Sequence, residues 1–112
     1  YLLPAHSVSA LHLYFPDPWP KRKHRRHRLV NERFPELARQ ALVAGGVVYL
    51  RTDHRDYFQQ MQEVFGAATA FEPVQTPPEL AARLTDFERG FLARGIQTLR
   101  AAYQCTVTGP QP

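Results

Sequence analysis

Three prolines, at positions 16, 18 and 20, constrain this chain more than any other feature of its sequence. They follow a near-continuous apolar run at residues 9–15, and a proline nitrogen has no hydrogen to donate to a neighbouring strand. The run must therefore end in a stiff turn, which carries one carboxylate, Asp17, and the chain's one tryptophan, Trp19. A single carboxylate in a rigid turn at the end of a strand is a candidate for recognition or chemistry.

A run of cations directly follows this turn. Residues 21–28 contain six lysines and arginines and no acidic residue, whereas the whole chain of 112 residues has a formal net charge of +4. Removing those six charges leaves −2 for all other residues, so the basicity belongs to one site. A localised basic run indicates contact with a polyanion such as a nucleic acid. The alternative is a solvated surface, but surfaces usually mix both signs of charge.

Length and composition set the outer bounds. A chain of this length is one domain or less, with enough apolar residues to form a core. Its one cysteine, Cys105, excludes an internal disulfide and fits a reducing cytoplasm. No apolar run is long enough for a membrane span, and we expect no signal peptide. Because the chain starts at Tyr1 and its one methionine is Met61, we expect a segment upstream to be missing or removed.

The first half of the chain reads as alternating strands and helices. Residues 9–15 and 47–50 are apolar and predict strands buried on both faces, as in a parallel sheet. Pro35 suits the first turn of a helix, and Gly45 with Gly46 suits its end. The predicted apolar face of this helix consists of Leu37, Ala38, Ala41 and Leu42.

A second helix is expected after the second strand. Asp53 stands in its N-cap position and Gly66 at its end. Its predicted apolar face consists of Tyr57, Phe58, Met61, Val64 and Phe65. The alternation predicts an α/β fold with right-handed crossovers.

The last third is less regular. Residues 69–74 suit a short strand, and a short helix is expected to open at Thr85 and close at Gly95. Residues 96–105 suit a final strand, although a helix remains possible. Residues 108–112 are expected to form a disordered tail, and nothing indicates a second domain.

At this point the motifs resemble a known family. The block at residues 15–21, the basic run with its His24 and Arg28, Thr52 and Asp53 ahead of Tyr57, and the late stretch 85–88 are similar to the bacterial tRNA (guanine-N7-)-methyltransferases. The Pro-Asp-Pro-Trp-Pro-Lys block is long and rare, so the resemblance is specific. It departs from the family at Lys23 and His27, where arginine is usual, and the segment between Phe65 and Thr85 is short.

The resemblance implies an architecture and a reaction. Residues 1–107 would be the C-terminal half of a Rossmann-like, S-adenosylmethionine-dependent methyltransferase sheet with flanking helices. The family's first half, with its glycine-rich cofactor loop, has no counterpart here. The implied reaction moves a methyl group from S-adenosylmethionine to N7 of a guanine in the variable loop of tRNA. Alone, the chain is expected to be inactive, and to self-associate or to pair with the missing N-terminal half.

The resemblance also implies roles for individual residues. Asp17 would be the catalytic residue and would lie where cofactor and substrate meet. The implied substrate-binding residues are Lys21, Asp53, Thr85, Asp86, Phe87 and Glu88, and the implied tRNA contacts are Lys23, His24, Arg25, Arg26, His27 and Arg28. No metal is expected, because no cysteine or carboxylate joins the two histidines at ligand spacing.

The chemistry of guanine suits a carboxylate. Its N7 already carries a lone pair, so methylation needs an in-line approach and a well-held base and no strong base catalyst. A carboxylate can accept hydrogen bonds from guanine N1–H and the 2-amino group, a pair that adenine lacks. Asp17 and Asp53 both follow strands, and ligands of doubly wound sheets bind at the carboxyl ends of strands. We therefore expect the two carboxylates to converge on one site.

Each assignment has a plainer alternative. Asp17 could cap its turn, Asp53 could be only a helix N-cap, and Trp19 could be a packing anchor or a base-stacking platform. Thr85 and Glu88 match a capping box. For the whole chain, two other functions stay open: a non-catalytic RNA-binding module, and a methyltransferase subunit that depends on a partner.

Overall fold

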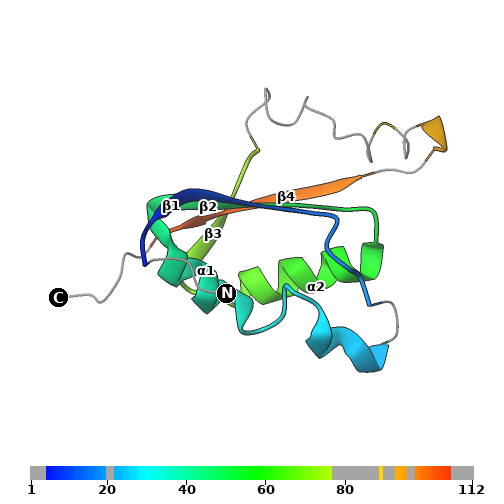
Figure 1. Ribbon diagram of the computed structural model, residues 1–112, viewed down its shortest axis with the longest axis horizontal. Helices are drawn as coiled ribbons and strands as arrows, with labels where there is room; N and C mark the ends of the chain where they lie inside the picture. Colours follow the sequence, from blue (N-terminus) through cyan, green and yellow to red (C-terminus); the bar gives the residue numbers. More distant parts are fainter. Residues whose placement is uncertain (1–4, 20–21, 77–88, 90–92, 96–97, 107–112) are drawn as a thin grey trace.

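The computed structural model describes residues 5–19, 22–76, 89, 93–95 and 98–106. Within them, four strands form one sheet in the order β1-β2-β4-β3 (Figure 1). Strand β2 pairs in parallel with β1 and antiparallel with β4, and β3 pairs antiparallel with β4. The elements in chain order are β1 (Val8–Tyr14), the 3-10 helix η1 (Arg22–His27), α1 (Phe34–Ala41), β2 (Leu42–Thr52), α2 (Arg55–Gly66), β3 (Phe71–Val74) and β4 (Leu99–Cys105).

Both α-helices lie on the same face of the sheet, below it in the view of Figure 1. Phe65 of α2 is the centre of the core between the two layers. Its ring stacks on Tyr103 of β4 at a centroid distance of 4.8 Å, and it meets Phe34 and Phe71 edge-on at 6.1 and 5.1 Å. Residues from five elements thus pack around one aromatic cluster, together with the buried side chains of Ala38, Leu42, Val48, Leu50, Tyr57, Met61 and Cys105.

The opposite face of the sheet carries aromatic and polar side chains. His12 stacks on Tyr49 at 5.0 Å, and the Arg51 guanidinium lies 4.4 Å from the centre of the Tyr14 ring. His12 is exposed and Tyr49 half-buried. The predicted burial of the first strand on both faces is therefore wrong here, because among the described elements only one face of β1 is covered by helices.

The end of the first helix also differs from the prediction. Helix α1 ends at Ala41, and Gly45 and Gly46 lie inside β2 and close no helix. The register against β1 shifts between the pairs Val8↔Leu42 and Ala10↔Val47. Gly45 has a φ of 75°, which favours glycine, so the glycines serve this irregularity in the strand.

One apolar position was also wrongly placed. Leu37 was predicted on the apolar face of the helix but is 58% exposed. The short helix buries only Phe34, Pro35, Ala38 and Ala41 against the sheet.

The remaining elements agree with the sequence. Helix α2 ends at Gly66 as predicted, and β3 lies within the predicted range 69–74. Residues 99–105 form a strand, which decides between strand and helix, and Cys105 is buried at its end. The predicted helix at 85–95 lies largely, and the predicted tail at 108–112 wholly, outside the described residues. In the described part of the chain, no helix is both long enough and apolar enough to cross a membrane.

The position of Phe65 leads to a stability prediction. Phe65→Ala removes a ring that is 1% exposed and should lower the free energy of unfolding by about 3–5 kcal/mol. The control Leu37→Ala, at an exposed site on α1, should change it by no more than about 0.5 kcal/mol. Urea unfolding of both variants measures the difference. Equal losses in the two variants would contradict this account of the core.

Candidate nucleic-acid interface

The carboxyl ends of β1 and β2 lie side by side. The two strands are parallel, and just beyond β1 the Phe15 amide donates a hydrogen bond to the Arg51 carbonyl at 2.8 Å. Asp17 follows β1 and Asp53 follows β2, and both side chains are exposed. The two carboxylates therefore leave the sheet at the same edge, as the strand pattern predicted.

The loop at residues 15–19 holds an uncommon backbone conformation at both ends. Phe15 has a φ of 56° and Trp19 a φ of 42°, and neither is glycine. Such residues cost about 1–3 kcal/mol each and persist only where their surroundings hold them. One restraint is local: the Trp19 amide donates to Asp17 Oδ1 at 3.2 Å. Asp17 thus caps its own turn, and its exposed carboxylate still has a second oxygen.

Arg28 holds the same loop from within the protein. Its side chain is fully buried. Its Nε donates to the Pro18 carbonyl at 2.5 Å, and its Nη2 donates to the Trp19 carbonyl at 3.3 Å. Two consecutive carbonyls of the loop are therefore bound by one guanidinium group, at the residues that directly follow Asp17.

Helix α2 provides the other side of this contact. Arg28 Nη2 donates to Asp56 Oδ2 at 2.8 Å and Nη1 to Gln60 Oε1 at 2.7 Å, while the group lies 5.0 Å from the centre of the Tyr57 ring. The hydrogen bond and charge of Arg28 hold the pKa of Asp56 below its usual value. The loop after β1 is thereby fixed to the first turns of α2.

Gln60 joins the basic segment to the same helix. It is 4% exposed and uses its whole amide. Its Oε1 accepts from Arg25 Nε and Arg28 Nη1, and its Nε2 donates to the carbonyls of Arg25 and Val30 at 3.1 and 3.0 Å. This pattern fixes the orientation of the amide and the position of η1 against α2.

These contacts divide the predicted tRNA-binding run into two groups. The prediction that Arg28 contacts tRNA is corrected: its guanidinium is buried and bound, so a phosphate cannot reach it in this structure. Arg25 is partly exposed but is bound to Gln60 and to Glu63, at 3.5 Å. The side chains of Lys23, Arg26 and His27 are exposed, and His24 is half-buried.

Asp53 is not the N-cap of α2. The N-cap is His54, whose Nδ1 accepts a hydrogen bond from the Tyr57 amide at 3.1 Å. A neutral imidazole nitrogen can accept in this way, and the extended backbone of His54 aims it at the helix. Helix capping therefore no longer explains Asp53, which remains an exposed carboxylate at the sheet edge. Five further predicted site residues lie outside the described residues: Lys21, Thr85, Asp86, Phe87 and Glu88.

Two residues of this site were missed from the sequence. Asp56 and Gln60 are spaced i, i+4 on α2, so they share a face of the helix. Gln60 directly precedes the buried Met61 and breaks the apolar face of α2, which is the signal that could have found it. A buried amide next to a run of arginines indicates a bound guanidinium.

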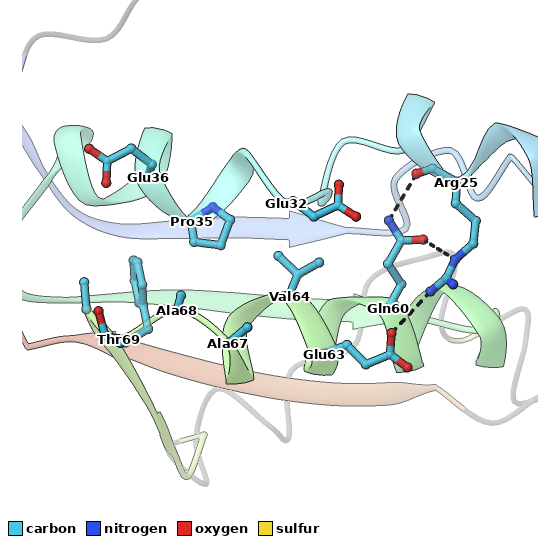
Figure 2. Close-up of a pocket in the computed structure, with 12 residues that line it drawn as sticks. Arg25, Glu32, Pro35, Glu36, Gln60, Glu63, Val64, Ala67, Ala68 and Thr69 are labelled. Atoms are coloured by element: carbon cyan, nitrogen blue, oxygen red, sulfur yellow. Dashed lines mark hydrogen bonds and ion pairs between the residues drawn. The ribbon is translucent and has the colours of Figure 1, made fainter.

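A cavity of about 640 Å³ lies between the two α-helices (Figure 2). It extends from Arg25 and Gln60 to Thr69 at the turn after α2. Three glutamates, Glu32, Glu36 and Glu63, line it. Negative charge repels phosphate, so these glutamates make the cavity unfavourable for a phosphate group.

Comparison with known proteins now identifies the family. A family model described as "Putative methyltransferase" matches residues 1–101. The chain belongs to this methyltransferase family. Its curated relatives include three tRNA (guanine-N(7)-)-methyltransferases. That of Aliivibrio fischeri is 38% identical over 106 residues, 88% of this chain and 44% of the relative.

The other two relatives give a similar picture. The protein of Halorhodospira halophila is 35% identical over 107 residues, 91% of this chain and 46% of its own length. That of Streptomyces avermitilis is 39% identical over 99 residues, which are 84% of this chain and 34% of its own length. The chain thus spans less than half the length of each of these relatives.

The described residues can be tested against a methyl donor. At the candidate site they supply the Asp17 carboxylate, but in the described ranges no glycine follows the carboxyl end of a strand. The described cavity lies between the helices and is lined by acidic groups. These residues alone therefore do not fit S-adenosylmethionine.

The burial of Arg28 makes a prediction with a matched control. Arg28→Met should lower the free energy of unfolding by about 3 kcal/mol or more, because it leaves buried acceptors unpaired. Arg39→Met removes an exposed pair with Glu36 and should cost no more than about 0.5 kcal/mol. Chemical unfolding at neutral pH measures both, and similar losses would contradict the structural role of Arg28.

Wild type and Arg28→Met also allow a test of the pH dependence of stability. The folded-state pKa of Asp56 is lowered, so its ion pair stabilises the fold above the usual carboxyl pKa of 3.8 and is lost as pH falls through the lower value. The stability difference between wild type and Arg28→Met should therefore narrow below pH 3.8. A difference that stays constant into acid would exclude a contribution from Asp56.

Proposed function

We propose that this chain functions in methylation of N7 of a guanine in the variable loop of tRNA, with S-adenosylmethionine as donor and in the cytoplasm. The relatives' names support the reaction and the substrate. The observation that carries the proposal is the loop with Asp17, fixed through Arg28 next to a 3-10 helix whose Lys23 and Arg26 are exposed. A carboxylate and a basic surface are thereby presented together.

Asp17 is proposed to hold the target base. One carboxylate oxygen already accepts from the Trp19 amide, and the second can accept from guanine N1–H or the 2-amino group. The guanine N7 lone pair needs no proton removed, so the contribution of this residue is to orient the base. A base held in the correct line to the methyl donor reacts faster without any acid or base step.

The exposed cations are proposed to hold the tRNA backbone. Lys23, Arg26 and His27 are exposed on η1, whereas Arg25 and Arg28 are bound to α2. Phosphate contacts release counterions, so each contact appears in the salt dependence of binding. We assign the substrate roles of Lys21, Asp53, Thr85, Asp86, Phe87 and Glu88 by resemblance to the family.

These phosphate contacts can be tested through the salt dependence of tRNA binding. Replacing Lys23 and Arg26 together by alanine should weaken tRNA binding and reduce the slope of log K against log salt by about two units. Fluorescence anisotropy with labelled tRNA at several salt concentrations measures the slope. The control Arg39→Ala, in the last turn of α1, should leave it unchanged. An unchanged slope in the double variant would rule out these contacts.

The second prediction concerns Asp17. Replacing the target guanine in tRNA by inosine removes the 2-amino group and should weaken binding to the wild type about tenfold. Asp17→Asn keeps the shape of the side chain but loses its charge and one acceptor, so it should bind both tRNAs almost equally. If Asp17→Asn still bound the guanine tRNA about tenfold more tightly than the inosine tRNA, the residue would have only its role in the turn.

A partner-dependent subunit is the second candidate function. Strand β1 lies at an edge of the sheet, and among the described residues it pairs with β2 alone. An edge strand presents unpaired backbone groups that another chain can join. The same edge supports the proposal that the chain associates with itself or with a segment that supplies the cofactor loop.

The last prediction separates these two candidates. Alone, the 112-residue chain should not bind S-adenosylmethionine tightly and should sediment as an associated species. Calorimetry with S-adenosylmethionine and analytical ultracentrifugation measure the two properties. Tight binding by a monomer would show that the chain has a complete cofactor site and needs no partner.

A further inference from the structure

Trp19 is an exposed aromatic side chain in a loop that is otherwise held firmly. It is 39% exposed, and it is the one tryptophan of the chain. It is absent from the core cluster around Phe65, whose members lie between the sheet and the helices. A packing anchor of this size would be buried in that core, so core packing does not explain the residue.

Two imidazoles of the basic helix fix the indole ring. The His24 ring lies edge-on to it at a centroid distance of 5.4 Å and an interplanar angle of 81°. The His27 ring lies at 5.5 Å and 38°, and the two imidazoles are 5.7 Å apart. The side chain is therefore restrained by two aromatic neighbours, while 39% of its surface remains open to solvent.

The backbone of Trp19 is restrained as well. Its amide donates to Asp17 and its carbonyl accepts from the buried Arg28, which holds the residue in the left-handed region. A ligand that contacts the indole therefore does not need to order it first. Restraint before binding lowers the entropic cost of association.

The surroundings indicate the chemical class of the ligand. Lys23 and Arg26 are exposed on η1, which also carries His24 and His27. Asp17 is two residues before Trp19 in the chain. Single-stranded nucleic acids bind where cations follow the phosphates and aromatic rings stack with bases. An exposed, restrained indole beside exposed cations has this arrangement.

We propose that Trp19, supported by His24 and His27, is a stacking platform for an unpaired base of the RNA. This deepens the proposed function and rests on it, since it assigns a base-binding residue to the same site. The stacked base lies beside the guanine that Asp17 holds, while Lys23 and Arg26 bind the adjoining phosphates. Stacking is independent of charge, so its contribution is separable from theirs by experiment.

The test uses two short strands of equal length: a single-stranded oligoribonucleotide without guanine, so that Asp17 does not contribute to the difference, and an abasic strand with the same number of phosphates. Wild type should bind the first about tenfold more tightly than the second, since stacking of one base is worth about that factor. The first strand should also quench the fluorescence of Trp19, the one indole in the chain, and the abasic strand should not.

The variants separate stacking from charge and from folding. Trp19→Leu should lower the affinity ratio of the two strands about tenfold and leave the salt slope unchanged, and Trp19→Phe should retain most of the ratio. Circular dichroism shows whether each variant is folded. If Trp19→Leu does not fold, quenching in the wild type and the ratio in Trp19→Phe still decide.

The outcomes separate the two claims. Equal ratios in wild type and in folded Trp19→Leu, or no difference in quenching between the two strands, would overturn the platform and leave the proposed function standing. If the wild type bound neither strand and no tRNA, the proposed function itself would fail. Binding with a lost ratio in Trp19→Leu and a normal salt slope supports the stacking role.

Discussion

The buried guanidinium of Arg28 is the contact on which the site depends. It joins the loop after β1, through two carbonyls, to Asp56 and Gln60 on α2. Burying a charge is costly unless it is paired and hydrogen-bonded, and here donors on all three nitrogens of the group have acceptors. The energy of these contacts offsets the strained backbone at the two ends of the loop. The loop is therefore rigid because a cation from the basic run lies inside the protein.

This contact changes the meaning of the basic run. A sequence of eight residues with six cations suggests one continuous surface for a polyanion. The structure gives Arg25 and Arg28 to the scaffold and leaves Lys23 and Arg26 exposed. Trp19 and Asp17 are held by the same scaffold. Within the basic run, the cations proposed to contact RNA and the arginines that hold the loop therefore cannot be told apart by residue type alone.

The sequence predicted what depends on local pattern and missed what depends on distant partners. Prolines and apolar periodicity located β1, α2 and the second strand, and the parallel pairing placed Asp17 and Asp53 at one edge. The Gly45–Gly46 pair was read as a helix end because a glycine serves a helix end and a strand irregularity equally well. Asp53 was predicted as the cap because aspartate is a preferred N-cap residue, whereas the cap in the structure is His54, which accepts from the Tyr57 amide.

The role of Arg28 could not be read from the sequence. Its partners on α2 are 28 and 32 residues away in the chain, and only the fold brings them together. The exposure of Lys23 and Arg26 depends in the same way on how the fold places η1 against α2.

The measurement that tests this account most directly is the rotational freedom of Trp19. Time-resolved fluorescence anisotropy of the one tryptophan should show the indole turning with the whole protein in the wild type. In Arg28→Lys, which keeps the charge but cannot reach the same four acceptors, a fast nanosecond component should appear under conditions where both proteins are folded. The same single slow decay in both proteins would show that Arg28 does not hold the loop.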